Sequence, residues 1–127
     1  MKTSFLGKTL SGPFTIPSGI VTTATPNIQY EFDHMPEVGV LTTKSIGLEP
    51  RDGYREPVFS QYAPGCFVNA VGLTNPGAET SLALLGALEV PEDRFLLTSI
   101  FGGSVEEFVA VAKILAPVSD GLELNLS

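Results

Sequence analysis

The sequence predicts an α/β fold in which parallel strands alternate with helices. Four short apolar runs, near residues 13–19, 39–45, 94–102 and 121–127, are bounded by Gly or Pro and are typical of buried strands. Helical patterns lie between these runs. Because a helical crossover between two strands must cover one face of the sheet, this order favours parallel strands.

The helical patterns differ in how clearly their ends are marked. Residues 27–36 fit a short helix that ends at a proline, and residues 75–90 fit a second helix capped by Asn75. A third helix begins at Ser104, which forms an S-x-x-E capping box with Glu107. The apolar face of this third helix is predicted to consist of Val105, Phe108, Val109, Ala112 and Leu115.

One interval between strand ends is longer than the others. The separation of Ser18 from Lys44 equals that of Ser99 from Asn125, and each suits one strand-helix unit. The longer interval between Lys44 and Ser99 predicts an insertion at roughly residues 48–74. Its pieces "EPVFSQYA" and "CFVNAVGL" flank a Pro-Gly turn and predict a β-hairpin lying across one end of the sheet.

Composition excludes several classes of protein. With 127 residues, 43% of them hydrophobic, the chain suits one globular domain with its own core. The net charge of −7 argues against a nucleic-acid partner, and no apolar run approaches the ~18 residues of a membrane span. The single cysteine cannot form an internal disulfide, and the amino terminus lacks the apolar core of a signal peptide, so we expect a cytoplasmic protein. No spacing typical of a metal site occurs.

Polar side chains stand at the ends of the predicted strands. In parallel α/β folds, ligands bind outside the carboxyl ends of the strands, so these side chains are expected to surround one opening: Ser18, Lys44, Ser45, Ser99 and Asn125. The alternative is that small polar residues merely cap the strands. Lys44 has no acidic residue among the four before it, so either a bound ligand offsets its charge or its side chain is simply exposed.

The stretch "GCFVNAVGLTNPG" supplies further candidates. The Asn69 side chain offers both a donor and an acceptor, which suits the edge of a planar amide or imide. Asn69 and Asn125 near one opening can therefore bind a heterocycle that alternates carbonyl and N–H groups. Asn69 and Asn75 are equally compatible with ordinary turn residues.

Five motifs in this order resemble the class 1 dihydroorotate dehydrogenases: "IPSG", "TTKSI", "EPRDGYREP", "NAVGLTNPG" and "ELNLS". These are FMN-containing flavoproteins of pyrimidine biosynthesis built on a (β/α)8 TIM barrel, and the motifs span essentially residues 1–127. The resemblance implies the amino-terminal half of that barrel, with a hairpin inserted after its second strand, over the active-site face. "NAVGLTNPG" is closer to the branch that pairs with an iron–sulfur flavoprotein subunit than to the fumarate-using branch.

The resemblance also implies roles for individual residues. Expected FMN contacts are Ser18, Gly19, Lys44, Ser45, Ser99 and Asn125. Expected contacts with dihydroorotate or orotate are Lys44, Asn69, Ala70, Val71, Gly72, Leu73 and Asn125. Lys44 is the expected catalytic residue, because its charge can stabilise negative charge that develops on the flavin.

The chain departs from the family pattern in one respect. The class 1 catalytic base is a cysteine directly after "ELNLS", whereas Cys66 lies in another motif and is not expected to replace it. We therefore expect activity only with a complementary carboxyl-terminal half-barrel chain, in a homodimer or in a hetero-oligomer with an electron-transfer subunit. The alternatives are a flavoprotein similar to dihydropyrimidine dehydrogenase and a non-catalytic half-barrel that only associates with a partner.

Overall fold

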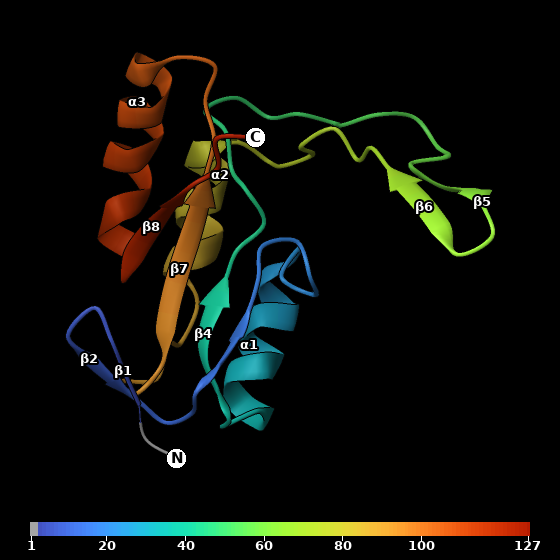
Figure 1. The fold of residues 1–127 in the computed structure, drawn as a ribbon. Coiled ribbons are helices and arrows are strands. Elements are labelled where there is room, and N and C mark those ends of the chain that lie inside the picture. The colour runs from blue at the N-terminus through green and yellow to red at the C-terminus, as the bar shows by residue number, and fades with distance from the viewer. Residues whose placement is uncertain (1–2) are drawn as a thin grey trace.

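A four-stranded parallel sheet forms the centre of the computed structural model, which describes residues 3–127. Its strands are β3 (Phe14–Ile16), β4 (Val38–Thr42), β7 (Phe95–Ile100) and β8 (Gly121–Leu124). They lie side by side in chain order, and each neighbouring pair is parallel (Figure 1). The predicted α/β class is confirmed, and all four apolar runs contain a strand of the sheet.

Three helices pack against one face of this sheet. They are α1 (Thr25–His34), α2 (Ala78–Gly86) and α3 (Val105–Leu115), and the short 3-10 helix η1 (Ala116–Val118) follows α3. The main core lies between helices and sheet, and its large buried side chains include Ile28, Phe32, Leu41, Leu96, Ile100, Val111 and Leu115. Burial of these apolar side chains is the main force that fixes each helix on the sheet.

An amino-terminal hairpin covers the other face of the sheet near the amino ends of its strands. It consists of β1 (Thr3–Phe5) and β2 (Lys8–Leu10), which pair in antiparallel fashion. Leu10 joins a second apolar cluster with Val40 and Phe95, and the Phe5 and Phe95 ring centroids are 5.1 Å apart. The sequence did not predict this hairpin, because its three-residue strands are too short to show a periodic pattern.

The predicted cap of α3 is confirmed, but its predicted apolar face is partly wrong. The Ser104 side chain accepts a hydrogen bond from the Glu107 backbone N–H at 3.3 Å. Val111 is fully buried, whereas Val105 and Val109 are 74% and 45% exposed. Helix α3 carries apolar residues on two sides, and only one of them contacts the core.

The predicted cap of α2 is wrong. The helix begins at Ala78, its N-cap is Gly77, and no side chain caps it. The backbone of Gly77 has a positive φ of 84°, which turns the chain into the helix and separates Asn75 from the first turn. The Asn75 side chain instead binds other backbone groups.

The long interval between β4 and α2 forms an arm, residues 51–75. Backbone hydrogen bonds join Arg51 and Asn75 at its base, and its tip is the antiparallel hairpin of β5 (Phe59–Ala63) and β6 (Cys66–Asn69). Figure 1 shows that this hairpin projects away from the sheet instead of lying across its end. Nearly every residue of β5 and β6 is exposed, so no packing contact holds the hairpin against the sheet.

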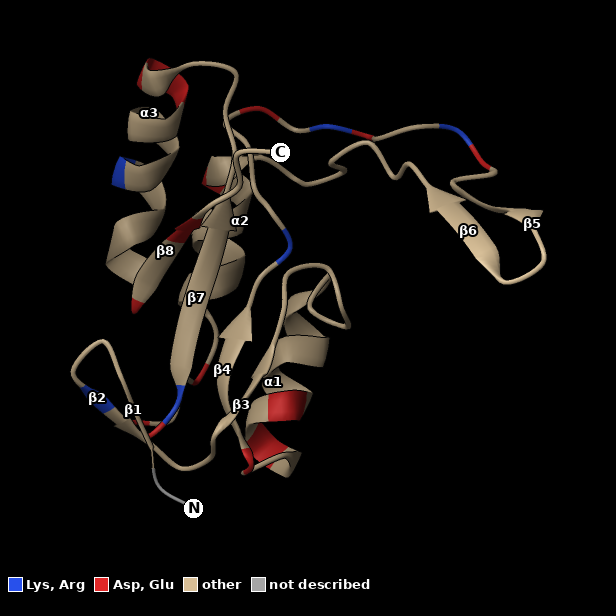
Figure 2. Cartoon of the chain, in the orientation of Figure 1, with Lys and Arg blue, Asp and Glu red and all other residues tan. Residues whose placement is uncertain are grey.

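Charged residues are distributed unevenly over the fold. Figure 2 shows Lys and Arg spaced singly along the described chain, while Asp and Glu gather on parts of α1 and α3. The first turn of α3 lowers the pKa of Glu106, because its own backbone N–H and the Ser104 hydroxyl donate to the carboxylate.

None of the helices described between residues 3 and 127 is both long and apolar enough to cross a membrane.

Arg94 is a buried cation that fixes the connection between α1 and β4. It is only 5% exposed, and its Nη1 donates hydrogen bonds to the backbone oxygens of Met35 and Val38, both at 2.7 Å. Met35 follows the last residue of α1, and Val38 is the first residue of β4. The guanidinium therefore binds one buried and one part-buried backbone acceptor.

Replacing Arg94 by methionine is expected to lower the free energy of unfolding by about 1–3 kcal/mol, because the buried Val38 carbonyl loses the Arg94 donor and the part-buried Met35 carbonyl keeps only the Val38 N–H. Urea denaturation of the parent protein and the variant measures this difference. Lys113→Met is the matched control, because Lys113 is exposed on α3 and the same charge is removed. Equal midpoints for Arg94→Met and the parent would show that the two hydrogen bonds do not stabilise the fold.

Candidate functional site

A hollow of about 530 Å³ opens at the carboxyl ends of the parallel strands, and we call it the strand-end hollow. The loop after β3 contributes Ser18 and Gly19, and the segment after β4 contributes Lys44 and Ser45. Other parts of its lining come from the arm and from the end of β8: Leu73, Glu123, Leu124, Asn125, Leu126 and Ser127. Segments far apart in the sequence therefore form one opening, at the edge where parallel α/β folds bind ligands.

The Ser45 hydroxyl is the central polar group of this site. It lies 2.9 Å from the Ser99 hydroxyl and accepts a hydrogen bond from Asn125 Nδ2 at 3.0 Å. The Ser18 hydroxyl is 3.4 Å away, which is a long hydrogen bond. One side-chain oxygen thus joins groups from the ends of all four strands.

Backbone hydrogen bonds hold Ser45 and Asn125 in place beyond the ends of their strands. The Ile46 backbone N–H donates to the Ser99 carbonyl oxygen, and the Asn125 backbone N–H donates to the Ile100 carbonyl oxygen, each at 2.9 Å. The Ser99 N–H donates to Thr43 Oγ1 at 3.1 Å. The pairing of the sheet continues into the site, so its polar side chains have fixed positions.

Ser99 itself does not line the hollow. Its side chain is fully buried, and its hydroxyl reaches the opening only through Ser45. The structure therefore places Ser18, Gly19, Lys44, Ser45 and Asn125 in the lining, with Ser99 behind Ser45.

Lys44 carries the only basic side chain among the residues described as lining the hollow. Its backbone N–H donates to the Thr22 oxygen at 3.2 Å, which fixes the start of the side chain. Within residues 3–127 no salt bridge or side-chain hydrogen bond involves Lys44 Nζ. The ammonium group is thus available to an anionic or electron-rich ligand.

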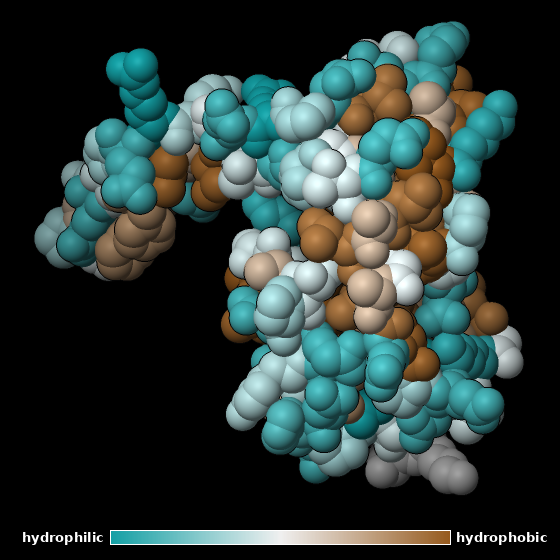
Figure 3. Space-filling view, turned by 180° about the vertical axis from the view of Figure 1, so that it is seen from behind, coloured by the Kyte–Doolittle hydropathy of each residue, from teal (hydrophilic) through white to brown (hydrophobic). Residues whose placement is uncertain are grey.

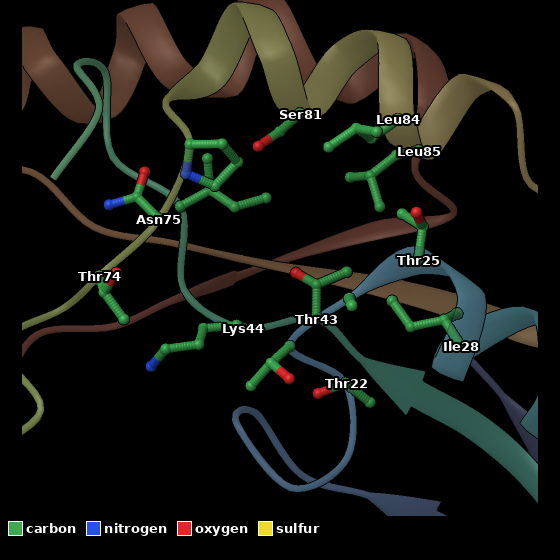
Figure 4. A pocket seen from close by; sticks show the side chains of 14 residues that line it. Thr22, Thr25, Ile28, Thr43, Lys44, Thr74, Asn75, Ser81, Leu84 and Leu85 are labelled. Atoms are coloured by element: carbon green, nitrogen blue, oxygen red, sulfur yellow. The ribbon is translucent and has the colours of Figure 1, made fainter. Parts of the chain in front are cut away.

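A second, smaller pocket of about 80 Å³ lies between α1, the end of β4 and α2 (Figure 4). Its lining is mainly apolar, with Ile28, Leu84 and Leu85, and includes hydroxyl groups such as that of Ser81. In Figure 4 the Lys44 side chain extends away from these residues. Lys44 lines both the small pocket and the strand-end hollow.

The arm brings only part of its predicted segment to the hollow. Leu73 lines it, whereas Asn69, Ala70, Val71 and Gly72 do not. Asn69 lies at the end of β6 and is exposed. The reason is the direction of the arm, which leaves the sheet at its base and carries its tip outward.

Asn75 fixes the base of the arm. Its Oδ1 accepts hydrogen bonds from the N–H groups of Gly47 and Gly77 at 3.2 and 2.9 Å, and its Nδ2 donates to the Leu73 oxygen at 2.8 Å. Gly47 follows the site segment after β4, and Gly77 precedes α2. One buried carboxamide thus holds Leu73 beside the hollow.

Sequence reasoning missed Glu123. This residue lies on β8, is half-buried, and contributes the only acidic side chain among the described residues that line the hollow. Side chains alternate along a strand, so a residue two positions before Asn125 shares its face. Extending the predicted strand back from Asn125 was the signal that could have found it.

These features define an α/β protein with a candidate ligand site at the carboxyl ends of its parallel strands, in a hollow lined by one ammonium group, hydroxyls and a carboxamide. The family model for dihydroorotate dehydrogenase matches residues 1–127. The chain belongs to the dihydroorotate dehydrogenase family.

Similar proteins from archaea share the name dihydroorotate dehydrogenase B (NAD(+)), catalytic subunit. The chain is 39% identical over 130 residues to that of Pyrococcus horikoshii and 40% identical over 128 residues to that of Pyrococcus furiosus. It is 31% identical over 127 residues to that of Methanothermobacter thermautotrophicus. Each match covers 100% of this chain and 40–41% of the relative. The predicted resemblance is confirmed, including its branch, because these relatives are named as B-type, NAD(+)-linked catalytic subunits.

Replacing Ser45 by alanine is expected to lower the free energy of unfolding by about 1–2 kcal/mol, because the buried Ser99 hydroxyl and Asn125 Nδ2 lose their common partner. Chemical denaturation of the variant measures the loss. Ser60→Ala in the exposed strand β5 is the control and is expected to change nothing. If both variants unfold at the same denaturant concentration, Ser45 does not hold the strand ends together.

Proposed function

We propose that this chain is the amino-terminal part of an FMN-dependent dihydroorotate dehydrogenase of pyrimidine biosynthesis, active together with a complementary carboxyl-terminal half-barrel. One observation carries the proposal: the Lys44 ammonium and the Asn125 carboxamide line a single hollow around the Ser45 hydroxyl, in a member of this family. The proposal includes a cytoplasmic location for this enzyme.

The donor set suits FMN. A flavin ring presents alternating carbonyl oxygens and ring nitrogens along one edge, which ammonium, hydroxyl and carboxamide groups can bind. Gly19 has a positive φ of 80°, and no atom lies within 4 Å of the position where its Cβ would stand, so backbone and ligand can approach closely there. In this proposal Ser18, Gly19, Lys44, Ser45 and Asn125 hold FMN, and Ser99 supports Ser45.

The proposed reaction removes two hydrogens from dihydroorotate. A base takes a proton from C5 while hydride leaves C6, and a carbon–carbon double bond forms between them to give orotate. FMN, when bound, supplies the hydride acceptor. Lys44 stabilises the negative charge that develops beside it, and Asn69 and Asn125 hold the pyrimidine ring flat, so most of the protein's contribution is positioning.

The arm must change direction for Asn69 to take part. Its base is fixed by Asn75, but its tip is exposed and makes no packing contact with the sheet. We propose that the complementary half-barrel brings residues 69–72 over the hollow. We also propose that this half supplies the base cysteine, at the position directly after Ser127 in the family pattern.

The surface of the chain supports such a partner. Strands β3 and β8 are the two edges of the sheet, and a parallel barrel has no free edge. A groove of about 560 Å³ beside β8 is lined mainly by apolar side chains from α3 and the end of the chain: Val105, Phe108, Val109, Ala112, Leu124 and Leu126. Figure 3 shows a broad band of apolar side chains on the side that carries the helices. The chain spans about 40% of its relatives' length, and the missing strands and helices would cover this groove.

The proposed assembly also includes an electron-transfer subunit or a second copy of the enzyme. The relatives carry the words NAD(+) and catalytic subunit in their names, which supports NAD+ as the final acceptor and a second subunit that reduces it.

Lys44→Ala in the complete assembly is expected to weaken retention of FMN or orotate and to lower kcat/KM for dihydroorotate at least ~10-fold, a loss of about 1.4 kcal/mol. Lys113→Ala removes the same charge from the outer surface of α3 and is the control. Steady-state kinetics and the flavin absorbance of the purified protein provide the two readouts. Unchanged kinetics in Lys44→Ala would remove this residue from the site.

The proposal as a whole is tested by reconstitution. Mixing this chain with its complementary half is expected to give a yellow protein that converts dihydroorotate to orotate. Protein that stays colourless in every preparation, including the mixture, would instead favour a half-barrel without catalytic function.

A further inference from the structure

Glu123 lines the strand-end hollow but has no role in the proposed reaction. Along β8 it is two residues before Asn125, so both side chains lie on the same face of the sheet. Its partner in the parallel pairing with β7 is Ser99, whose hydroxyl binds Ser45. Glu123 therefore stands on the face that carries the site, one step deeper in the sheet than Asn125.

Two other carboxylates, Asp120 and Glu107, have clear structural partners, whereas Glu123, like Glu31 on α1, has none among the described residues. Asp120 accepts hydrogen bonds from Lys8 Nζ and the Leu96 N–H, and Glu107 accepts one from the Gly103 N–H. No salt bridge or side-chain hydrogen bond of Glu123 occurs within residues 3–127. A half-buried carboxylate without such a partner requires another explanation.

Glu123 and Lys44 are the acidic and the basic side chain of one hollow, within the described lining. A half-buried charge in such a place acts on a bound ligand, because the effective dielectric constant near a protein surface is lower than that of bulk water. The two side chains act in opposite directions. The ammonium favours a ligand that gains negative charge, and the carboxylate disfavours it directly and by offsetting part of the ammonium's field.

We propose that Glu123 lowers the midpoint potential of the FMN held in this hollow and so opposes Lys44. This inference rests on the proposed function, which places FMN there. In the proposed reaction two electrons leave dihydroorotate as hydride from C6, and its C5 proton goes to the base. FMN, when bound, would accept this hydride, and two electrons with one proton would then convert NAD+ to NADH. Glu123 changes the equilibrium of these transfers and gains or loses no bond.

A lowered FMN midpoint potential suits NAD+ as the proposed final electron acceptor. NAD+ is a weak oxidant, so a flavin that must reduce it works best at a low potential. A carboxylate in the flavin site provides that bias without occupying the positions of Lys44 or Asn125. Glu123 thereby suits the site to an NAD+-linked enzyme rather than to one with a stronger oxidant.

Glu123→Gln in the assembled, FMN-loaded enzyme tests the inference. We expect the FMN midpoint potential, measured by equilibration with redox dyes, to rise by about 30 mV. This rise corresponds to a tenfold change in the two-electron equilibrium constant. Glu123→Asp keeps the charge and is expected to restore most of the parent potential. Lys44→Ala is expected to shift the potential in the opposite direction. Glu79→Gln, which removes a charge from the exposed first turn of α2, is the matched control and is expected to leave the potential unchanged.

The outcomes separate this inference from the proposed function. A parent assembly that binds no FMN overturns the proposed function, before any substitution is made. A parent that binds FMN, together with a Glu123→Gln variant at the parent potential, overturns the role of Glu123 alone. An equal rise in Glu79→Gln also overturns it, because the effect then comes from net charge. If Glu123→Gln does not assemble, the midpoint potential of the smaller neutral variant Glu123→Ser is measured in the same way. A raised potential then supports the role of Glu123, and the parent potential overturns it.

Discussion

The site depends on a single hydroxyl group, that of Ser45. Four strands end at the same edge of the sheet, and each contributes a polar group that would be costly to bury alone. Ser45 Oγ offers a donor and two lone pairs, and the groups around it are the hydroxyls of Ser18 and Ser99 and the Asn125 carboxamide. Because these partners come from separate strand-helix units, their hydrogen bonds can form only when the sheet has the correct order and register. The same contacts that order the strand ends also prepare the lining for a ligand.

Much of the sheet and of its polar edge could be predicted from the sequence. Buried parallel strands are near-continuous apolar runs, so β4 and β7 are evident, and equal spacing placed Ser18, Lys44, Ser99 and Asn125 at one edge. The capping box of α3 was recognised because Ser104 and Glu107 are local neighbours. Features of this kind are encoded within a few residues or by a fixed period.

The features that escaped prediction depend on distant contacts. The amino-terminal hairpin exists because Phe5 and Leu10 pack against Phe95, a contact that no local pattern reveals. The position of Asn75 before Pro76 predicts a helix cap, but its carboxamide forms hydrogen bonds with the backbone of Gly47 and Leu73. The direction of the arm was missed for a related reason: its strands pair with each other, and their sequence carries no information about what they lie against.

The amino-terminal hairpin has a consequence for how a barrel could be completed. Leu10 and Phe5 already fill the space below Val40 and Phe95, at the end of the sheet opposite the ligand site. Strands added at either edge must therefore surround a hairpin that is already packed against the sheet. This hairpin closes one end of the completed barrel, so ligands can enter only at the other end, where Lys44 and Asn125 lie.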